Sequence, residues 1–270
     1  MSSQYENLPQ PGDYAAFFKV SPVEVPAERL VRANRLSGMV RAVAQPVSSD
    51  AMVADVVSVA GGAAEAAPLP ESTVAVASDA VPAAKPKAPP VQREWVQAQF
   101  GFVAHWVKSA SDARLRAPKQ LVARNDTVST VQAYRDAWLA GQRCIIPMQA
   151  FFEDDLRSGK PVSTRISRVD GEPMGVAGVW SRWQDPDSGA ELISYAILTV
   201  NANSHALMHR YQHPGSEKRM PAILNEGSYD AWLTARQDKA REFLRAYPSN
   251  WLTANPVERK QDKKPKGWLG

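Results

Sequence analysis

Residues 135–153 decide the fold, through the pieces Arg135-Asp136-Ala137-Trp138, Arg143-Cys144-Ile145-Ile146-Pro147 and Phe151-Phe152-Glu153. Their spacing predicts a helix with Trp138 on its apolar face, followed by a short apolar strand that ends at Glu153. A carboxylate directly after two aromatic rings costs free energy unless it has a partner or a function. On the residues alone, an ion pair with a nearby arginine is the simpler interpretation of Glu153, and a catalytic role is the alternative.

The flanking sequence alternates strands with helices. We expect helices over residues 13–18, 128–140, 229–234 and 237–247, strands over 100–106, 162–166, 175–183 and 193–200, a strand followed by a turn over 142–152, and a turn at 185–189. Strands dominate the middle of the chain and helices lie on either side of it. This order predicts an α+β fold with a largely antiparallel, barrel-like sheet.

One long segment has a different composition. No aromatic residue occurs between Phe18 and Trp95, and residues 42–92 are rich in Ala, Val, Pro and Ser. Such a sequence makes a poor core, and its prolines interrupt helices and ladders. We therefore expect a single domain over residues 1–256, interrupted by a flexible insertion at about 42–92, and a basic tail over 257–270.

Composition restricts the class of protein. The chain has 270 residues, a formal net charge of +4 and one cysteine, Cys144, so no intramolecular disulfide can form. The N-terminus does not resemble a secretory signal, and no apolar run reaches the roughly 18–20 residues of a membrane helix. We expect a cytoplasmic monomer that makes no contact with membranes and has no metal or other cofactor, because no metal-ligand or phosphate-loop motif is present.

Seven pieces of the sequence, in order, resemble the SOS-response-associated peptidase (SRAP) family, whose members crosslink to abasic sites in single-stranded DNA. These pieces, together with the N-terminal Ser2 to Glu6, are Gly101-Phe102-Val103-Ala104-His105-Trp106-Val107-Lys108, Ala123-Arg124-Asn125-Asp126-Thr127-Val128, the stretch from Arg135 to Pro147, Phe151-Phe152-Glu153, Val176-Ala177-Gly178-Val179-Trp180, Leu198-Thr199-Val200-Asn201-Ala202 and Glu217-Lys218-Arg219-Met220-Pro221. Trp232-Leu233 follows them. The resemblance covers nearly everything outside the insertion.

Two positions of the family's reaction centre differ here. The family begins Met-Cys, whereas this chain has Ser2, and Val122 replaces the Asn that precedes Ala-Arg in the family. The resemblance implies that the N-terminal α-amine condenses with the abasic aldehyde and that the thiol then closes a thiazolidine. An α-amine has a pKa of about 8 and keeps a nucleophilic fraction at neutral pH, whereas an unassisted hydroxyl is a poor nucleophile. We expect Ser2 to form a reversible imine and to impair the stable crosslink.

The resemblance also assigns site residues. Glu153 would orient the amine or relay protons, and His213 would move protons to and from the sugar oxygen, with His209 as second choice and His205 as a local packing or capping residue. Arg124 and Arg219 would grip phosphates, Trp106 would stack on a base, and Lys108 and Thr199 are weaker candidates for contacts with the DNA backbone. Cys144 is predicted to be an inert core thiol.

Three functions remain open. The first is recognition of, and crosslinking to, abasic sites in single-stranded DNA, with crosslink reversal or autoproteolysis at the same centre. The second is a non-catalytic module that binds single-stranded DNA, which Ser2 and Val122 favour. The third is a hydrolase with a Ser-His-Glu triad, in which Ser2 is the nucleophile and His213 the base, although no nucleophile elbow surrounds Ser2.

Overall fold

The core of the protein is a closed five-stranded barrel. The computed structural model describes residues 4–24, 26, 28–43 and 91–257. The barrel strands, in order around the ring, are β10 (Glu191–Asn201), β4 (Arg93–Phe100), β3 (Leu36–Ala42), β6 (Arg143–Met148) and β9 (Met174–Gln184), and pairing between β9 and β10 closes the ring. Only the β10–β4 pair among these is parallel.

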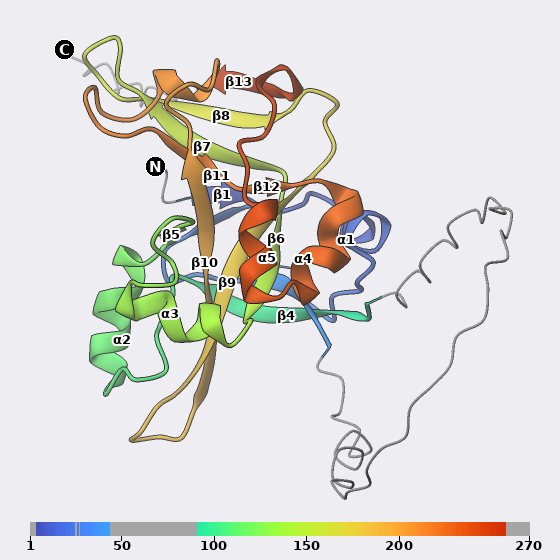
Figure 1. Cartoon of the computed structure of the whole chain (residues 1–270), viewed down its shortest axis with the longest axis vertical. Helices are drawn as coiled ribbons and strands as arrows, with labels where there is room; N and C mark the ends of the chain where they lie inside the picture. The colour runs from blue at the N-terminus through green and yellow to red at the C-terminus, as the bar shows by residue number, and fades with distance from the viewer. Residues whose placement is uncertain (1–3, 25, 27, 44–90, 258–270) are drawn as a thin grey trace, which may run out of the picture. The chain divides into compact units, whose positions relative to one another are not determined.

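A second sheet continues directly from the barrel. Its strand order is β13 (Leu252–Pro256), β8 (Val162–Arg168), β7 (Ala150–Asp155), β1 (Gln4–Glu6) and β2 (Leu30–Arg32), and every neighbouring pair is antiparallel. Gln149 alone separates β6 from β7, so the chain passes from the barrel into this sheet without a loop (Figure 1). The stretch of sequence that decides the fold therefore joins its two sheets.

Three short strands pair with the barrel strands β9 and β10, and helices pack around the sheets. They are β5 (Val122–Arg124) and β11 (Arg219–Pro221), which both pair with β10, β12 (Ile223–Leu224), which pairs with β9, and the helices α1 (Pro11–Phe18), α2 (Ala110–Arg116), α3 (Gln132–Leu139), α4 (Tyr229–Thr234) and α5 (Gln237–Ala240). Short 3₁₀ turns lie at Ala117–Lys119, Met208–Arg210, Glu226–Ser228, Arg241–Phe243 and Ser249–Trp251.

Tryptophans connect the helices to the barrel. Trp138 of α3 and Trp232 of α4 are both buried, and the Trp232 indole N–H donates a 2.9 Å hydrogen bond to the Cys144 carbonyl on β6. The Arg143 guanidinium lies over both rings, 5.1 Å from the centre of the Trp138 ring and 5.8 Å from that of Trp232. Trp138 therefore lies on the apolar face of its helix, as the sequence predicts.

The α+β class with largely antiparallel sheets is confirmed, and two local predictions are corrected. The strand predicted over 100–106 is wrong, because β4 ends at Phe100 and the next residue, Gly101, has φ of +119°. The chain turns at this positive φ. Glycine is required there because a Cβ on residue 101 would lie 2.8 Å from the Ala117 carbonyl oxygen. The single strand predicted over 142–152 is two strands in different sheets, and only 237–240 of the last predicted helix is α-helical.

The predicted insertion falls almost entirely outside the described residues. At its two ends, Ala42 of β3 pairs with Arg93 of β4, and the Val43 amide donates to the Gln92 carbonyl. In the part of the chain that the structure describes, no helix is long and apolar enough to cross a lipid bilayer.

Candidate functional site

Glu153 lies on the buried face of β7. Phe151, two residues earlier, points to the same side because strand side chains alternate, and its neighbours across the sheet, Tyr5 and Ile166, are buried. Glu153 itself is only 2% exposed and pairs with Thr164 of β8. The strand therefore carries a carboxylate at the end of a core-facing row, which is the position that the sequence analysis singled out.

The N-terminal strand begins beside this carboxylate. β1 runs antiparallel to β7, with Tyr5 opposite Phe151 and Glu6 opposite Ala150. Gln4, the first residue of β1, consequently lies at the end of the pair that is nearer to Glu153. Ser2, the predicted nucleophile, lies outside the described residues.

Two buried polar groups hold β1 in place. The Tyr5 hydroxyl lies 2.5 Å from the Tyr195 hydroxyl of β10, so β1 is bonded to the barrel, and burial raises the pKa of both phenols. The Glu6 carboxylate is buried and lies 2.7 Å from the Arg165 guanidinium and 3.1 Å from that of Arg29. A three-residue strand has few ladder hydrogen bonds, so these side chains supply most of the constraints on its position.

Arg219 and Thr199 form the buried part of an arginine cluster. Arg219 Nε donates to the Thr199 hydroxyl at 3.0 Å, and one terminal nitrogen donates to the Thr199 carbonyl and the Asn125 side-chain oxygen, both at 2.7 Å. The other terminal nitrogen lies 2.6 Å from Glu217. Arg219 is therefore held rigidly, in an orientation set by β10 and β11.

Arg124 forms the exposed part of this cluster. It pairs with Thr199 in the β5–β10 ladder, and its guanidinium contacts Asp126 at 2.6 Å and Glu217 at 2.8 Å. The hydrogen bond from Arg124 lowers the pKa of Asp126 to about 2, with a further contribution from the charge of Arg219. The structure thus brings together Arg124, Thr199 and Arg219, three residues that the sequence analysis selected separately.

Gln212 joins the arginine cluster to β7. Its side-chain amide donates to the Arg219 carbonyl at 2.7 Å, its side-chain oxygen accepts from the Arg219 amide at 3.2 Å, and its own amide donates to the Asp154 carbonyl at 3.4 Å. Gln212 adopts φ of +66°, a conformation that costs free energy for a residue with a side chain. The residue next to Glu153 and the phosphate-binding candidate Arg219 therefore share one neighbour.

The histidines have different surroundings. His213 follows Gln212 and is exposed, with its carbonyl accepting from the Lys218 ammonium and the Ser216 hydroxyl. His209 is also exposed. His205 is buried, where Nδ1 accepts from the amides of residues 207 and 208 and Nε2 donates to the Tyr247 carbonyl, which confirms its packing and capping role.

Two of the predicted DNA contacts lie on a different part of the fold. Trp106 is half-buried in the loop after β4, and the Arg116 guanidinium lies 5.4 Å from its ring centre. This loop lies beside the start of β10, since the Val103 amide donates to the Ser194 hydroxyl, whereas the arginine cluster lies at the other end of that strand. Lys108, two residues after Trp106, is exposed.

The surroundings of Cys144 and Val122 indicate that both residues contribute to the packing of the fold. Cys144 is fully buried on β6, and burial raises the pKa of its thiol, as expected for an inert core residue. Val122 is half-buried on β5, and its carbonyl accepts from the Tyr134 hydroxyl at 3.0 Å.

Sequence reasoning missed three residues of the site. Asn125 and Gln212 belong to the site through their bonds to Arg219. Tyr211 is buried, and its pKa is raised by burial first, then by Asp155, with a further contribution from Glu153, which places it within electrostatic range of that carboxylate. Only Asn125 had a sequence signal, because it directly follows Arg124 in a motif of the family.

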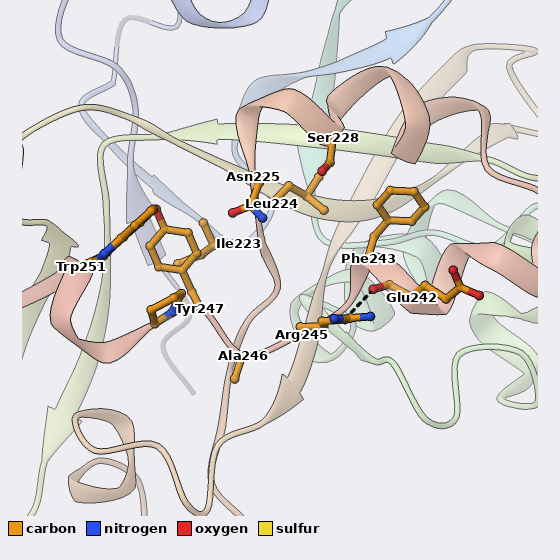
Figure 2. Close-up of a pocket in the computed structure, with 11 residues that line it drawn as sticks. Ile223, Leu224, Asn225, Ser228, Glu242, Phe243, Arg245, Ala246, Tyr247 and Trp251 are labelled. Atoms are coloured by element: carbon orange, nitrogen blue, oxygen red, sulfur yellow. Dashed lines mark hydrogen bonds between the residues drawn. The ribbon is translucent and has the colours of Figure 1, made fainter. Parts of the chain in front are cut away.

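A separate pocket lies on the C-terminal part of the chain. It has a volume of about 550 Å³ and is lined by residues of β12, by Phe243, and by Tyr247 and Trp251 (Figure 2). None of the predicted site residues lines it. Over the described ranges, no group of three His, Cys, Asp or Glu side chains is arranged to hold a metal ion.

The sequence is similar to known proteins. The sequence matches the family model for SOS response associated peptidases (SRAP) over residues 43–263. The abasic site processing protein HMCES of Gallus gallus is 25% identical over 186 residues, which cover 62% of this chain and 53% of that protein. HMCES of Pongo abelii is 24% identical over 187 residues, which cover 59% of this chain and 51% of that protein. The chain spans about half the length of the curated relatives it matches.

Solved structures share the fold. A protein from Bordetella bronchiseptica superposes with a TM-score of 0.71 at 28% identity, covering 96% of this chain and all of that one. A protein from Bacteroides thetaiotaomicron gives a TM-score of 0.56 at 26% identity, covering 61% of this chain and 70% of that one. Because the family match extends over most of the sequence, this chain belongs to the SOS response associated peptidase (SRAP) family.

Proposed function

We propose that this protein recognises abasic sites in single-stranded DNA and attaches to them through the α-amine of Ser2. Relatives that match more than half of this chain are named as abasic site processing proteins. The observation that carries the proposal is the position of Gln212, which contacts both β7 beside Glu153 and the phosphate-binding candidate Arg219. Gln212 bonds both the residue next to this carboxylate and the arginine cluster, an arrangement that suits a damaged nucleotide.

The covalent step is an imine formation. With Met1 removed, the α-amine of Ser2 attacks the aldehyde carbon of the ring-opened sugar, and loss of water gives the imine. Glu153 accepts and returns the amine proton, and His213 transfers a proton to or from the sugar oxygen. Ser2 has no thiol to close a thiazolidine, so water can hydrolyse the imine and release the DNA.

The DNA backbone binds at the arginine cluster. Arg124 is half-exposed and Arg219 is held by Thr199, so one guanidinium is available at the surface while the other orients the site. Arginine matches phosphate geometry because its planar group donates two parallel hydrogen bonds. Trp106 and Lys108, on the loop after β4 at the opposite end of β10, form a separate contact for the DNA.

A comparison of the native Ser2 protein with Ser2→Cys tests the proposal. Both are mixed with single-stranded DNA that contains one abasic site, with and without sodium borohydride, and separated on a denaturing gel. We expect a borohydride-dependent band from native protein and a borohydride-independent band from Ser2→Cys. A form with one extra glycine before Ser2 displaces the amine and is the matched control.

Other outcomes assign the alternative functions. If neither form gives a band, while native protein binds DNA in a salt-sensitive way that ignores the abasic site, the chain is a non-catalytic module that binds single-stranded DNA. If a fluorophosphonate probe labels Ser2, the chain is a hydrolase of the Ser-His-Glu type.

A further inference from the structure

A pocket of about 480 Å³ has Gln212, which bonds Arg219 of the arginine cluster, among its lining residues. Its lining residues are Leu156, Arg157, His209, Arg210, Gln212, Pro214 and Lys218. Three of these side chains are cations and none is a carboxylate. A concave surface with this charge concentrates anions, and two of its residues, Leu156 and Arg157, follow the end of β7 within four positions of Glu153.

The cation nearest β7 is already oriented. Arg157 Nε and one terminal nitrogen donate to the Asp155 carboxylate, at 3.0 Å and 2.5 Å. This hydrogen bonding lowers the pKa of Asp155, so the carboxylate stays charged and keeps the guanidinium in place. The remaining terminal nitrogen of Arg157 is the part of its planar group that can meet a ligand.

The other donors come from the segment before β11. Lys218 donates from its ammonium to the carbonyls of Gln212 and His213, at 3.2 Å and 2.5 Å, which holds the charge at the rim of the pocket. His209 donates from Nδ1 to the His205 carbonyl at 2.9 Å, so Nε2 is the nitrogen left for a ligand. Arg210 is exposed.

The pocket and the arginine cluster are connected through Gln212. The side chain of Arg219 contacts Asn125 and Glu217, next to Arg124, whereas its main chain contacts Gln212, which lines the pocket. Gln212 therefore links the pocket to the arginine cluster, and one nucleic acid strand that contacts Arg124 can also reach the pocket.

We propose that this pocket binds a backbone phosphate of the same DNA strand, one other than the phosphate held by Arg124. A tetrahedral phosphate accepts hydrogen bonds from several directions, which two arginines and a lysine supply. Leu156 and Pro214 add apolar surface for the adjoining sugar, and the volume exceeds that of a phosphate alone. This inference rests on the proposed function, because it takes the ligand to be the DNA strand that carries the abasic site.

Methylphosphonate substitution tests the assignment. Each phosphate of a single-stranded oligonucleotide with one abasic site is replaced in turn by a neutral methylphosphonate, and non-covalent affinity is measured by fluorescence anisotropy for native protein, Arg210→Gln and Arg157→Gln/Arg210→Gln. One phosphate contact with single-stranded DNA contributes about 0.7 to the slope of log affinity against log salt. This corresponds to about a fivefold difference in affinity at 0.1 M salt. We expect Arg210→Gln to lose about that factor and that slope.

The decisive result is the loss of sensitivity at one position. Native protein should lose about fivefold when one particular phosphate is neutralised, and the double variant should lose nothing further there. Arg236→Gln is the matched control, because Arg236 is an exposed arginine directly before α5, 3.7 Å from Asp238, and none of the proposed DNA contacts lies on that helix. The affinity of this control, and its sensitivity to each methylphosphonate, should equal those of native protein.

Three results would overturn the inference. Equal affinity and salt slope for native protein and the double variant, while native protein still gives the borohydride-dependent band, would refute the pocket and leave the proposed function intact. Failure of native protein both to bind and to give the band would refute both. Competition by inorganic phosphate that the double variant abolishes, with no sensitive position in the scan, would assign the pocket to free anions instead of the strand.

Discussion

Gln212 contacts both main-chain polar groups of Arg219, donating to its carbonyl at 2.7 Å and accepting from its amide at 3.2 Å. A side-chain amide in this arrangement replaces a strand partner at Arg219, the first residue of β11. Because the Gln212 amide also donates to Asp154, this residue sets the separation between β7 and the arginine cluster.

Gln212→Ala should therefore weaken both stability and DNA binding. It removes two hydrogen bonds to Arg219, and we expect the free energy of unfolding to fall by about 1–2 kcal/mol in urea denaturation. Affinity for single-stranded DNA should fall as well, because Arg219 loses its position. Gln184→Ala removes a comparable exposed glutamine bond, to Gly189 in the β9–β10 turn, and should leave the affinity unchanged. Equal affinities for native protein and Gln212→Ala would show that Gln212 has no positioning role.

Asp126→Asn should strengthen DNA binding. Asp126 neutralises Arg124 through a 2.6 Å ion pair, and a phosphate must compete with that carboxylate. Exposed ion pairs contribute up to about 1 kcal/mol, so we expect the affinity to rise by about two- to fivefold in anisotropy titrations. Arg124→Gln, the opposite change, should reduce both the affinity and the salt slope. A loss of affinity in Asp126→Asn would mean that Asp126 orients Arg124 instead of competing for it.

The same ion pair predicts a pH dependence. The pKa of Asp126 is lowered from 3.8 to about 2, so its folded state binds protons less readily than the unfolded chain. Its contribution to stability is therefore complete above about pH 5 and is lost as the pH falls from 4 toward 2. The difference in free energy of unfolding between native protein and Asp126→Asn should shrink over that range, and 1 M salt should reduce it at every pH. If the difference in free energy of unfolding stayed constant with pH, the ion pair between Asp126 and Arg124 would be excluded as its source.

Tyr195→Phe should impair trapping of abasic DNA more than its effect on stability alone would explain. The change removes the barrel's hydrogen bond to Tyr5 and should cost about 1–2 kcal/mol. It also loosens β1, so the rate of borohydride trapping should fall. Tyr229→Phe loses another buried hydroxyl, bonded to Gly175 and distant from β1, and should cost similar stability at an unchanged trapping rate. Equal trapping rates for both variants would mean that the Tyr5–Tyr195 bond does not position β1.

Cys144 should resist thiol reagents until the protein unfolds. Its side chain is fully buried and burial raises the pKa of its thiol, so both access and thiolate formation are suppressed. Maleimide labelling followed by mass spectrometry should show no modification of native protein within minutes and complete modification in 6 M guanidinium. The Ser2→Cys protein should gain one fast-reacting thiol. Rapid labelling of native protein would contradict the burial of Cys144.

The predictions from sequence succeeded where a local pattern and the tertiary environment agree. The helix expected over residues 229–234 coincides with α4, whose Tyr229, Trp232 and Leu233 are buried on one face. The strand expected over 100–106 failed because residues 100–104 are all buried, without the alternation of a strand, around a turn that Gly101 permits. The sequence of β6 and β7 reads as one strand, and only the pairing partners reveal that the chain changes sheets at Gln149.

The sequence selected three residues that the fold brings together, but it did not indicate how they are connected. The family resemblance selected Arg124, Thr199 and Arg219, and the β10 ladders bring these three together. No local pattern indicates Gln212, because its role depends on a positive φ and on contacts with two separate strands. Pocket residues such as Arg157 and Arg210 belong to loops, where charge alone does not distinguish a binding residue from a solubilising one.

The site of covalent attachment tests the central claim most directly. Protein whose Met1 is removed, as verified by intact mass, is trapped with borohydride on abasic single-stranded DNA, digested with nuclease and protease, and mapped by tandem mass spectrometry. We predict one adduct, on the α-amine of Ser2, and a yield that falls at least tenfold in Glu153→Gln. An adduct on a lysine side chain, or an unchanged yield in Glu153→Gln, would contradict the account.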